Sequence, residues 1–223
     1  MNWGIPANQW QPVYHVQSPP SYPFAPPNQQ WAGPPWASLK SAPDYLKSIG
    51  VSATMSSKYP HLNPALAPDT TLMRYDISKK ARNTLSPDAW HAHASSLATA
   101  VPTRHLRLIS KHFPWTIEIV VYDAQAVVTC QSVWDALYSA MQEEIVDSEW
   151  GFIAMDRKRR EATERARRKR LDMRDSDTRY KRVDYLGDMP IFKGLERDTD
   201  FEGNRVMKGV EPCAETWVVK LGT

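Results

Sequence analysis

The chain has 223 residues with 28 Lys/Arg and 25 Asp/Glu, a formal net charge of +3, and 42% of its residues are hydrophobic. That length suits one domain with added segments, and the hydrophobic fraction is enough for a core. Two cysteines are too few for a disulfide framework, and no apolar run approaches the ~18 residues of a membrane-spanning helix. The uncharged, proline-broken start also lacks the pattern of a signal peptide. We therefore expect an intracellular protein, cytoplasmic and/or nuclear, with no membrane partner.

The first 58 residues differ in composition from the rest. No Asp, Glu, Lys or Arg occurs before Lys40, and nine prolines fall within the first 35 residues. Prolines at this density remove backbone donors and push the preceding residues into extended conformations. We predict that residues 1–58 form a disordered tail rich in proline and aromatic residues. Residues 59–223 are then expected to form a single domain.

One motif in this tail is typical of a docking ligand. Pro19, Pro20 and Tyr22 fit the PPxY pattern of WW-domain ligands, in which extended prolines lie in an aromatic groove. Because prolines are frequent in this segment, a chance match is the competing interpretation. On the first interpretation, the tail binds a protein partner through these three residues.

Strand patterns dominate the middle of the chain. Strands are predicted at 72–77 and 104–109, with a short helix opening at Ser86 between them. Apolar and polar residues alternate over 115–122, which predicts a strand with one buried face. A further short strand is expected at 127–130.

A helix with clear signals follows. Ser132 is the predicted N-cap, and Asp135 three residues later fits a capping box. Its apolar residues recur every four positions: Val133, Leu137, Met141 and Ile145. We expect this face to pack on the preceding strand.

A second, long helix is predicted over 149–173, about 36 Å at ~1.5 Å per residue. Nine of its residues are basic: Arg157, Lys158, Arg159, Arg160, Arg165, Arg167, Arg168, Lys169 and Arg170. Its expected contact with the domain is a thin stripe: Met155, Ala162, Ala166 and Met173. The remaining surface is expected to face water.

The basic helix has three competing interpretations. Glu161 and Glu164 lie four residues from several arginines, which favours a solvated, self-stabilised helix. Lys/Arg runs of this kind are also typical of nuclear import or protein docking. The third interpretation is binding to nucleic acid through counterion release, or to an anionic membrane. No aromatic residue lies within 156–173 to stack on bases, and the apolar stripe is too narrow for a membrane surface.

The chain closes with predicted strands at 182–186, 191–195 and 216–221, separated by a polar loop over 196–211. In the last strand three residues are expected to face inward: Trp217, Val219 and Leu221. Strands, then two helices, then strands predict an α+β fold. We expect a small, mostly antiparallel sheet packed by a central helix and followed by the long charged helix.

Several segments also match a known pattern in their order. They include LMRYDIS (72–78), PWTIEI (114–119), VTCQSVWDALYSAMQEEI (128–145) and RVDYLGDMPIFKGLER (182–197). With these pieces the chain resembles, over about residues 62–221, a domain family of unknown function found chiefly in mushroom-forming (basidiomycete) fungi. The resemblance implies a small single domain with a sheet and helices. It supplies no activity, cofactor or catalytic residue.

Signals for an enzyme or a metal site are thin. There is no G-x-G-x-x-G, G-x-x-x-x-G-K-[ST], H-E-x-x-H or G-x-S-x-G motif. His91 and His93 would share a face if extended, with Cys130 as a third ligand, but metal sites need three or four organised ligands. Cys130 beside His105 or His112 would form a thiolate pair. The competing interpretation is a small buried hydrophobe.

These observations favour an uncharacterised, non-enzymatic protein-interaction module with a docking tail and an exposed arginine-rich helix. We expect no catalytic residue, cofactor or metal. The alternative is a nuclear or nucleic-acid-associated protein that uses the basic helix. The third hypothesis is an enzyme of unrecognised type, with a cleft around His105, His112, Cys130 or Asp123.

Overall fold

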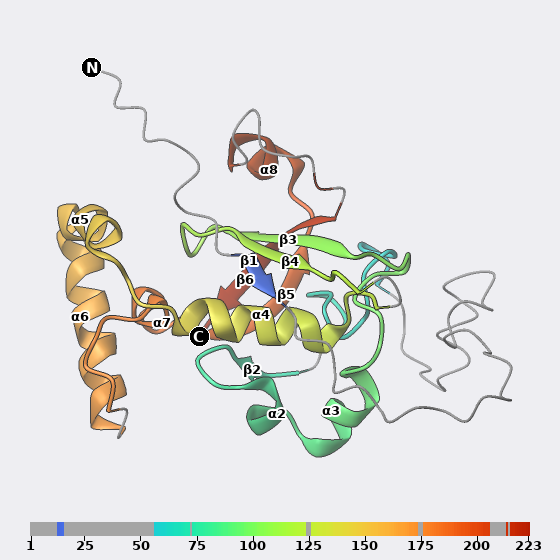
Figure 1. Cartoon of the computed structure of the whole chain (residues 1–223), viewed down its shortest axis with the longest axis horizontal. Coiled ribbons are helices and arrows are strands. Elements are labelled where there is room, and N and C mark those ends of the chain that lie inside the picture. Colours follow the sequence, from blue (N-terminus) through green and yellow to red (C-terminus); the bar gives the residue numbers. More distant parts are fainter. Residues whose placement is uncertain are drawn as a thin grey trace, which may run out of the picture.

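The computed structural model describes residues 13–15, 56–71, 73–123, 126–173, 176–205, 213 and 215–223. Within them the predicted α+β fold is confirmed: a twisted, mixed sheet is crossed on one face by a long helix, and two further helices stand at one end (Figure 1). None of the described helices is both long and apolar enough to cross a membrane.

In the described residues the sheet has six strands, in the order β1-β4-β3-β6-β5-β2. They are β1 Val13–His15, β2 Tyr75–Asp76, β3 His105–Ser110, β4 Ile117–Val120, β5 Ile191–Glu196 and β6 Thr216–Gly222. Three pairings are antiparallel (β3 with β4, β5 with β6, β2 with β5) and two are parallel (β3 with β6, β1 with β4). The predicted strands near 104–109, 191–195 and 216–221 are confirmed, and β6 lies at the centre of the sheet.

The helices pack around this sheet or beyond its end. They are α2 Ala81–Thr84, α3 Pro87–His93, α4 Cys130–Gln142, α5 Asp147–Met155, α6 Arg157–Asp172, α7 Arg182–Tyr185 and α8 Thr199–Arg205. The predicted helix opening after Ser86 is confirmed as α3, in which the Ser86 hydroxyl accepts from the Ala89 backbone N–H.

Helix α4 presents the predicted apolar face to the sheet. Val133, Leu137 and Met141 are fully buried, and they belong to one cluster with β3, β4 and β6 residues. Trp134 is buried beside them, 6.4 Å from the Tyr75 ring. Burying a side chain of this size removes about 150–250 Å² from water, so this layer supplies the apolar core.

The start of α4 differs from the prediction. Thr129 is the N-cap: its hydroxyl accepts from the Ser132 backbone N–H over 3.2 Å, and the Ser132 hydroxyl accepts from the Thr129 N–H over 3.3 Å. The predicted box on Ser132 and Asp135 is therefore wrong by three residues. The strand predicted at 127–130 is also wrong, because Cys130 already begins the helix and Thr129 makes only an isolated bridge to Leu97.

Both faces of the sheet are covered, whereas the alternation over 115–122 predicted one buried face. Ile109 and Val218 lie on the face away from α4, and they are as buried as residues on the α4 face. Figure 1 places α8 on that side of β3, where Lys111 pairs with Asp198 at 2.6 Å and lies over the Phe201 ring. Part of the loop predicted over 196–211 is thus a helix.

Two other predicted elements have a different form. The long helix over 149–173 is broken at Asp156, whose carboxylate accepts from the Lys158 and Arg159 backbone N–H groups and so caps α6. The segment at 182–186 is helix α7 and not a strand. There Asp184 accepts from the Lys181 backbone N–H over 2.9 Å, which satisfies a donor at the helix start.

Most of the tail, residues 1–12 and 16–55, lies outside the described residues, as does Leu72. Within the tail, Val13–His15 forms β1 at the sheet edge. The longer described ranges begin at Ser56, a buried residue whose hydroxyl donates to Asp69 over 2.8 Å.

Candidate interaction surface

The basic helix belongs to a unit that we call the arm: helices α5 and α6, together with the segment 176–187 that contains α7. In Figure 1 the arm stands at one end of the sheet, and α6 runs across the direction of α4. Helix α6 packs against α5 and α7, and α7 packs against α4. The basic helix therefore reaches the body of the domain chiefly through α7.

Arg170 makes the densest contacts between α6 and the segment that carries α7. Its guanidinium donates to both carboxylate oxygens of the buried Asp184, over 2.9 and 2.8 Å. It also donates to the backbone carbonyls of Asp177 and Arg179. A planar guanidinium matches this set of acceptors in a way that a lysine ammonium cannot. Arg170 is therefore a structural residue of the arm.

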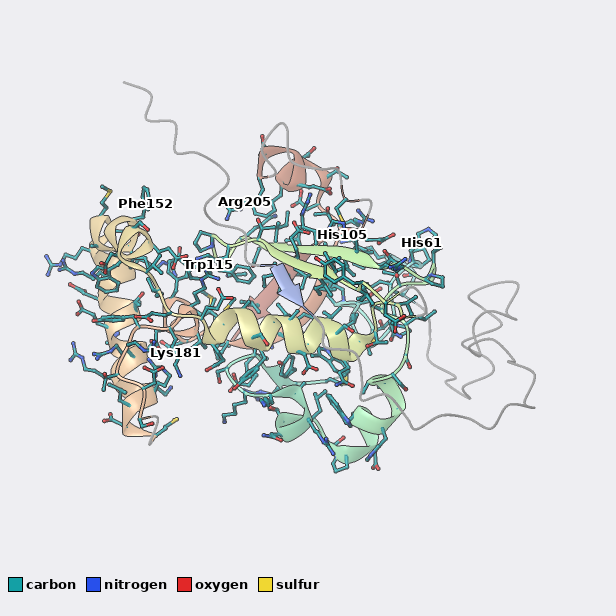
Figure 2. All side chains as sticks on the ribbon, in the orientation of Figure 1. His61, His105, Trp115, Phe152, Lys181 and Arg205 are labelled. Carbon is teal, nitrogen blue, oxygen red and sulfur yellow. The ribbon has the colours of Figure 1, made fainter. Side chains whose placement is uncertain are left out.

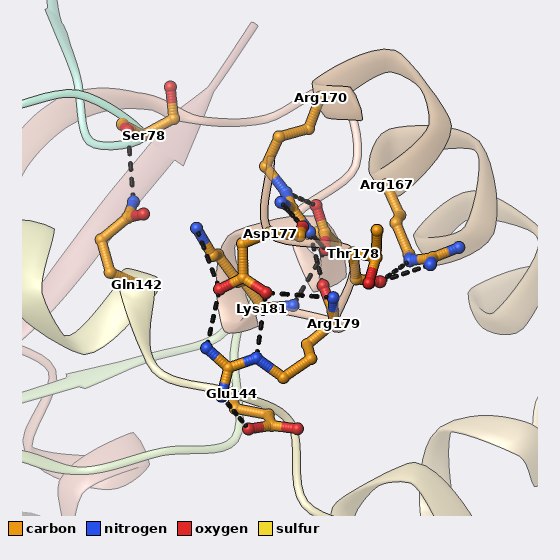
Figure 3. Close-up of polar contacts among 10 residues, drawn as sticks. Ser78, Gln142, Glu144, Arg167, Arg170, Asp177, Thr178, Arg179 and Lys181 are labelled. Atoms are coloured by element: carbon orange, nitrogen blue, oxygen red, sulfur yellow. Dashed lines mark hydrogen bonds and ion pairs between the residues drawn. The ribbon is translucent and has the colours of Figure 1, made fainter. Parts of the chain in front are cut away.

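Arg167 and Arg159 hold the same segment through rings and carbonyls. Arg167 donates to the Thr178 carbonyl over 2.7 Å and lies 4.7 Å from the Tyr180 ring centre. Arg159 lies 4.5 Å from the Tyr185 ring centre and donates to the carbonyl of the same residue. Figure 3 shows Arg167 and Arg170 directed from α6 toward this segment. Three of the nine basic side chains thus face inward.

Three further arginines pair with glutamates on the same helix. Arg157 lies 2.8 Å from Glu161, while Arg160 and Arg168 each lie 3.8 Å from Glu164. Exposed pairs with this i,i+4 spacing stabilise a helix by only about 0.3–0.5 kcal/mol each. They agree with the self-stabilised helix expected from the sequence.

The last three basic residues are Lys158, Arg165 and Lys169. All three are exposed, and within the described chain no ion pair involves them. Steps of seven and four residues bring them within about 40° of one another around the helix, along about 16 Å of its axis. We call them the outer basic stripe.

Exposed apolar side chains lie at the end of the arm where this stripe begins. Met155 is 83% exposed and Phe152 is 56% exposed, both on α5 just before Lys158. Figure 2 places Phe152 at the far end of the arm. Met155 and Met173 were predicted to contact the domain, and this is wrong because both face water. The residue of α6 that is buried is Thr163.

A polar cluster joins the arm to the body, and we call it the latch: the buried residues Arg182, Glu149 and Trp115, with the partly exposed Glu143. Arg182 donates to Glu149 over 2.8 Å and also to Glu143. Its guanidinium lies 4.8 Å from the Trp115 ring centre, and the Trp115 indole N–H donates to Glu149 over 2.8 Å. Figure 2 shows Trp115 between the arm and the sheet. Removing one partner from a buried ion pair strongly destabilises a fold.

Backbone pairing reinforces the latch. The Arg182 N–H donates to the Glu143 carbonyl, and the Ile145 N–H donates to the Tyr180 carbonyl, each over 2.8 Å. The Tyr180 ring is also stacked on Trp150 of α5, with ring centres 4.3 Å apart. Beside this junction Arg179 pairs with Asp177 and Glu144 (Figure 3), and its guanidinium holds the pKa of the Asp177 carboxyl well below the usual range.

Comparison with known protein families gave a match for this chain. The profile of a family of unknown function, DUF6699, matches residues 64–203, which is more than half of the chain. The chain belongs to DUF6699. Comparison with curated proteins and with solved structures gave no match. The resemblance to a domain family of unknown function is confirmed, while its concentration in mushroom-forming fungi stays a prediction.

The part of this DUF6699 chain that matches the family contains the whole arm and the latch, whereas β6 lies beyond it. Sequence reasoning missed the latch. Arg182 and Glu149 were expected in a strand and a solvated helix, and nothing local marks either residue as buried. A usable signal was Glu149 three residues after Val146, a spacing at which its carboxylate accepts the N–H that begins α5, over 3.2 Å.

A second buried ion cluster lies within the sheet. Glu118 of β4 accepts from Arg107 Nε over 2.5 Å and lies 2.6 Å from His105 Nε2, both on the neighbouring strand β3. Arg107 and Glu118 are direct cross-strand partners, and both are buried. Both Glu118 oxygens are therefore used, and this cluster satisfies charge inside the fold.

The two histidines considered as metal ligands do not face the same way. His91 and His93 lie on helix α3, where a two-residue step puts them on opposite sides, so the shared face expected for an extended segment does not form. Among the described residues, no group of three or more His, Cys, Asp or Glu side chains is placed to hold a metal ion. Burial lowers the pKa of His93.

Cys130 and the two remaining histidines do not form the considered thiolate pair. The Cys130 thiol is fully buried in the first turn of α4, where it faces the Leu97 carbonyl at 3.8 Å, and burial raises its pKa. His105 and His112 flank opposite ends of β3, and Asp123 is exposed beyond β4. Burial, and then the nearby Arg159, lower the pKa of His112.

The docking residues considered in the tail, Pro19, Pro20 and Tyr22, lie outside the described residues. Binding of a partner through these three residues stays a prediction.

Proposed function

We propose that this DUF6699 protein is a non-enzymatic interaction module whose arm binds an acidic segment of a partner protein. The observation that carries the proposal is the outer basic stripe. Lys158, Arg165 and Lys169 are exposed on one side of α6, and within the described chain no carboxylate lies at ion-pair distance from them. A partner that supplies carboxylates at that spacing would gain charge-assisted hydrogen bonds.

The apolar end of the arm supports a protein partner. Phe152 and Met155 expose large apolar surfaces next to the start of the stripe. Aromatic residues and methionine are enriched in protein interfaces, where burying them provides much of the binding free energy. The expected ligand is therefore an acidic segment that also carries apolar residues.

The same contacts support nucleic acid less well, which is the alternative function. Of nine basic side chains, three bind the segment that carries α7, and three pair with glutamates. Phe152 is exposed at the end of the arm, but the rings of Tyr180 and Tyr185, which contact α6, are covered by Arg167 and Arg159. Stacking on bases would need those rings to be open.

A charge-matched pair of variants tests the proposal. The first, Lys158→Gln/Arg165→Gln/Lys169→Gln, removes the outer basic stripe. The second, Arg157→Gln/Arg160→Gln/Arg168→Gln, removes the same charge from the self-paired arginines. The probe is a labelled peptide of alternating Glu and Leu, and binding is measured by fluorescence anisotropy. We expect the first variant to lose at least tenfold in affinity and the second less than threefold.

Equal losses in the two variants would contradict a role for the stripe. A parallel titration with a labelled 20-base single-stranded DNA tests the alternative. Each phosphate contact steepens the salt dependence of nucleic-acid binding. Tighter binding to the DNA than to the peptide at physiological salt would favour the nucleic-acid function. Nuclear accumulation of a tagged chain, abolished by the first variant only, would assign the same residues to import.

The proline-rich tail is the second contact that we propose. It rests on Pro19, Pro20 and Tyr22, which fit the ligand pattern of WW domains. The full chain should bind an isolated WW domain, and Tyr22→Ala should remove that binding while leaving the acidic-peptide titration unchanged.

A further inference from the structure

The edge of the sheet at β4 is completed by a strand from a distant part of the chain. β1 comprises residues 13–15, and residues 16–55 separate it in sequence from the next described residue, Ser56. All other described strands come from residues 75–222. The outermost strand on this side is therefore contributed by a segment joined to the domain through a long connection.

The pairing is short. Three register pairs join the strands in parallel: Val13 with Glu118, Tyr14 with Ile119 and His15 with Val120. Each hydrogen bond adds only about 0.5–1.5 kcal/mol net, and ordering each backbone residue costs about 1–2 kcal/mol. Three paired residues therefore bind weakly without the connection. The covalent connection keeps β1 at an effective concentration on the order of millimolar.

An edge strand exposes unpaired N–H and C=O groups, and such an edge accepts an extended segment of another chain. We propose that the outer edge of β4 is a strand-binding site for an extended segment of a partner protein, and that β1 occupies this site as an internal competitor. This proposal is independent of the arm, which lies at the α6 and α7 end of the molecule (Figure 1).

The surroundings of β4 define the chemistry of the ligand. At the register position of Glu118 the carboxylate is buried and already bound by Arg107 and His105. Neighbouring residues in register lie on the same face of a sheet. An acidic residue there would meet Glu118 at close range, whereas an uncharged residue such as Val13 would not.

The next register position, opposite Ile119, favours an apolar residue. Ile119 is fully buried on the face that α4 covers, and α4 contacts both β4 and β1. The ligand is therefore an extended segment that runs parallel to β4. It has an uncharged residue opposite Glu118 and an apolar or aromatic residue opposite Ile119.

The test uses the full chain with its own strand disabled. Only every second N–H group of a strand points at its neighbour. The adjacent substitutions Val13→Pro/Tyr14→Pro therefore remove an inter-strand donor, whichever of the two N–H groups makes the pairing. The control, Gln29→Pro/Gln30→Pro, adds the same prolines elsewhere in the tail. The probe is a fluorescein-labelled peptide of residues 10–18, titrated by anisotropy.

We expect the Val13→Pro/Tyr14→Pro chain to bind the peptide at least fivefold more tightly than the wild type and the control do. Amide hydrogen exchange over residues 117–120 should be faster in that variant and slow again when the peptide is added. This exchange measurement reports on β4 directly, so a general loss of structure would be recognised in the other strands.

The peptide sequence tests the assigned register. A Val13→Glu peptide should lose at least tenfold in affinity, while a Val13→Thr peptide should stay within about threefold of the parent. No binding to the proline variant, or equal binding to the variant and the wild type, would overturn the strand-binding site. Equal affinity of the Glu and Thr peptides would overturn the chemistry assigned to it.

Discussion

The body and the arm of this DUF6699 protein use charge in opposite ways. In the body, apolar layers from α4 and the sheet carry the packing, and one ion cluster, Arg107 with Glu118 and His105, is enclosed within the sheet. In the arm, α6 buries a single threonine and is held by Arg159, Arg167 and Arg170. The comparison teaches that a highly basic helix can dock on a domain through its own cations.

This difference divides the basic residues by role. Arginines that bind rings, carbonyls and a buried carboxylate position the helix, and they leave Lys158, Arg165 and Lys169 directed to water. Hydrophobic packing is non-directional, whereas guanidinium hydrogen bonds fix the rotation of α6 about its axis. The rotation in turn decides which cations a partner meets.

The largest effect that tests the comparison is expected at the latch. Arg182→Ala leaves Glu149 buried without its cation, a change that costs about 3–5 kcal/mol in buried pairs. We expect the free energy of unfolding from urea titrations to fall by that amount. The control Arg179→Ala removes an exposed arginine from the same segment and should cost less than about 1 kcal/mol. Equal losses would mean that the arm is joined mainly by apolar packing.

The body and the arm were also predictable to different degrees. Strands β4 and β6 and the apolar face of α4 follow from the spacing of apolar residues, because burial on one face leaves a regular spacing in the local sequence. The break between α5 and α6 had a local signal, because Asp156 is a typical N-cap residue. The charged residues continue on both sides of it, so the sequence was interpreted as one helix. No local signal marks the inward face of α6. Arg170 and Arg165 are the same residue type, and they differ only in their contacts with segment 177–185, which is distant in sequence.

Alkaline pH should affect the body through two buried acids. Burial raises the pKa of the Cys130 thiol and of the Tyr75 hydroxyl, which donates to the Trp134 carbonyl. Above about pH 8.5 the unfolded chain loses the thiol proton that the folded chain keeps. The stability contributed by this group is complete below that pH and falls by up to about 1.4 kcal/mol per pH unit above it. Tyr75 adds to the slope above about pH 10.

Urea titrations between pH 7 and 10 measure this slope. Cys130→Ala should flatten the dependence between pH 8.5 and 10, whatever its effect on stability at pH 7. The substitution Cys213→Ala is the comparison: that thiol is only partly buried, and burial also raises its pKa, so we expect it to flatten the slope less than Cys130→Ala does. A slope unchanged by Cys130→Ala would show that the buried thiol is not the group that titrates.

The smallest effect is expected on the solvent side of α6. Glu164→Gln removes two pairs, with Arg160 and Arg168, so it should cost less than about 1 kcal/mol and nothing measurable in 1 M salt, where the Debye length is about 3 Å. The same substitution removes one negative charge from the helix that carries the outer basic stripe, so the acidic peptide should bind more tightly. Glu161→Gln, which removes only the pair with Arg157, should cost about half as much stability. Loss of a solvent-side pair should lower stability slightly and raise peptide affinity. If the Glu164→Gln chain lost both stability and peptide affinity, Glu164 would belong to the structural part of the arm.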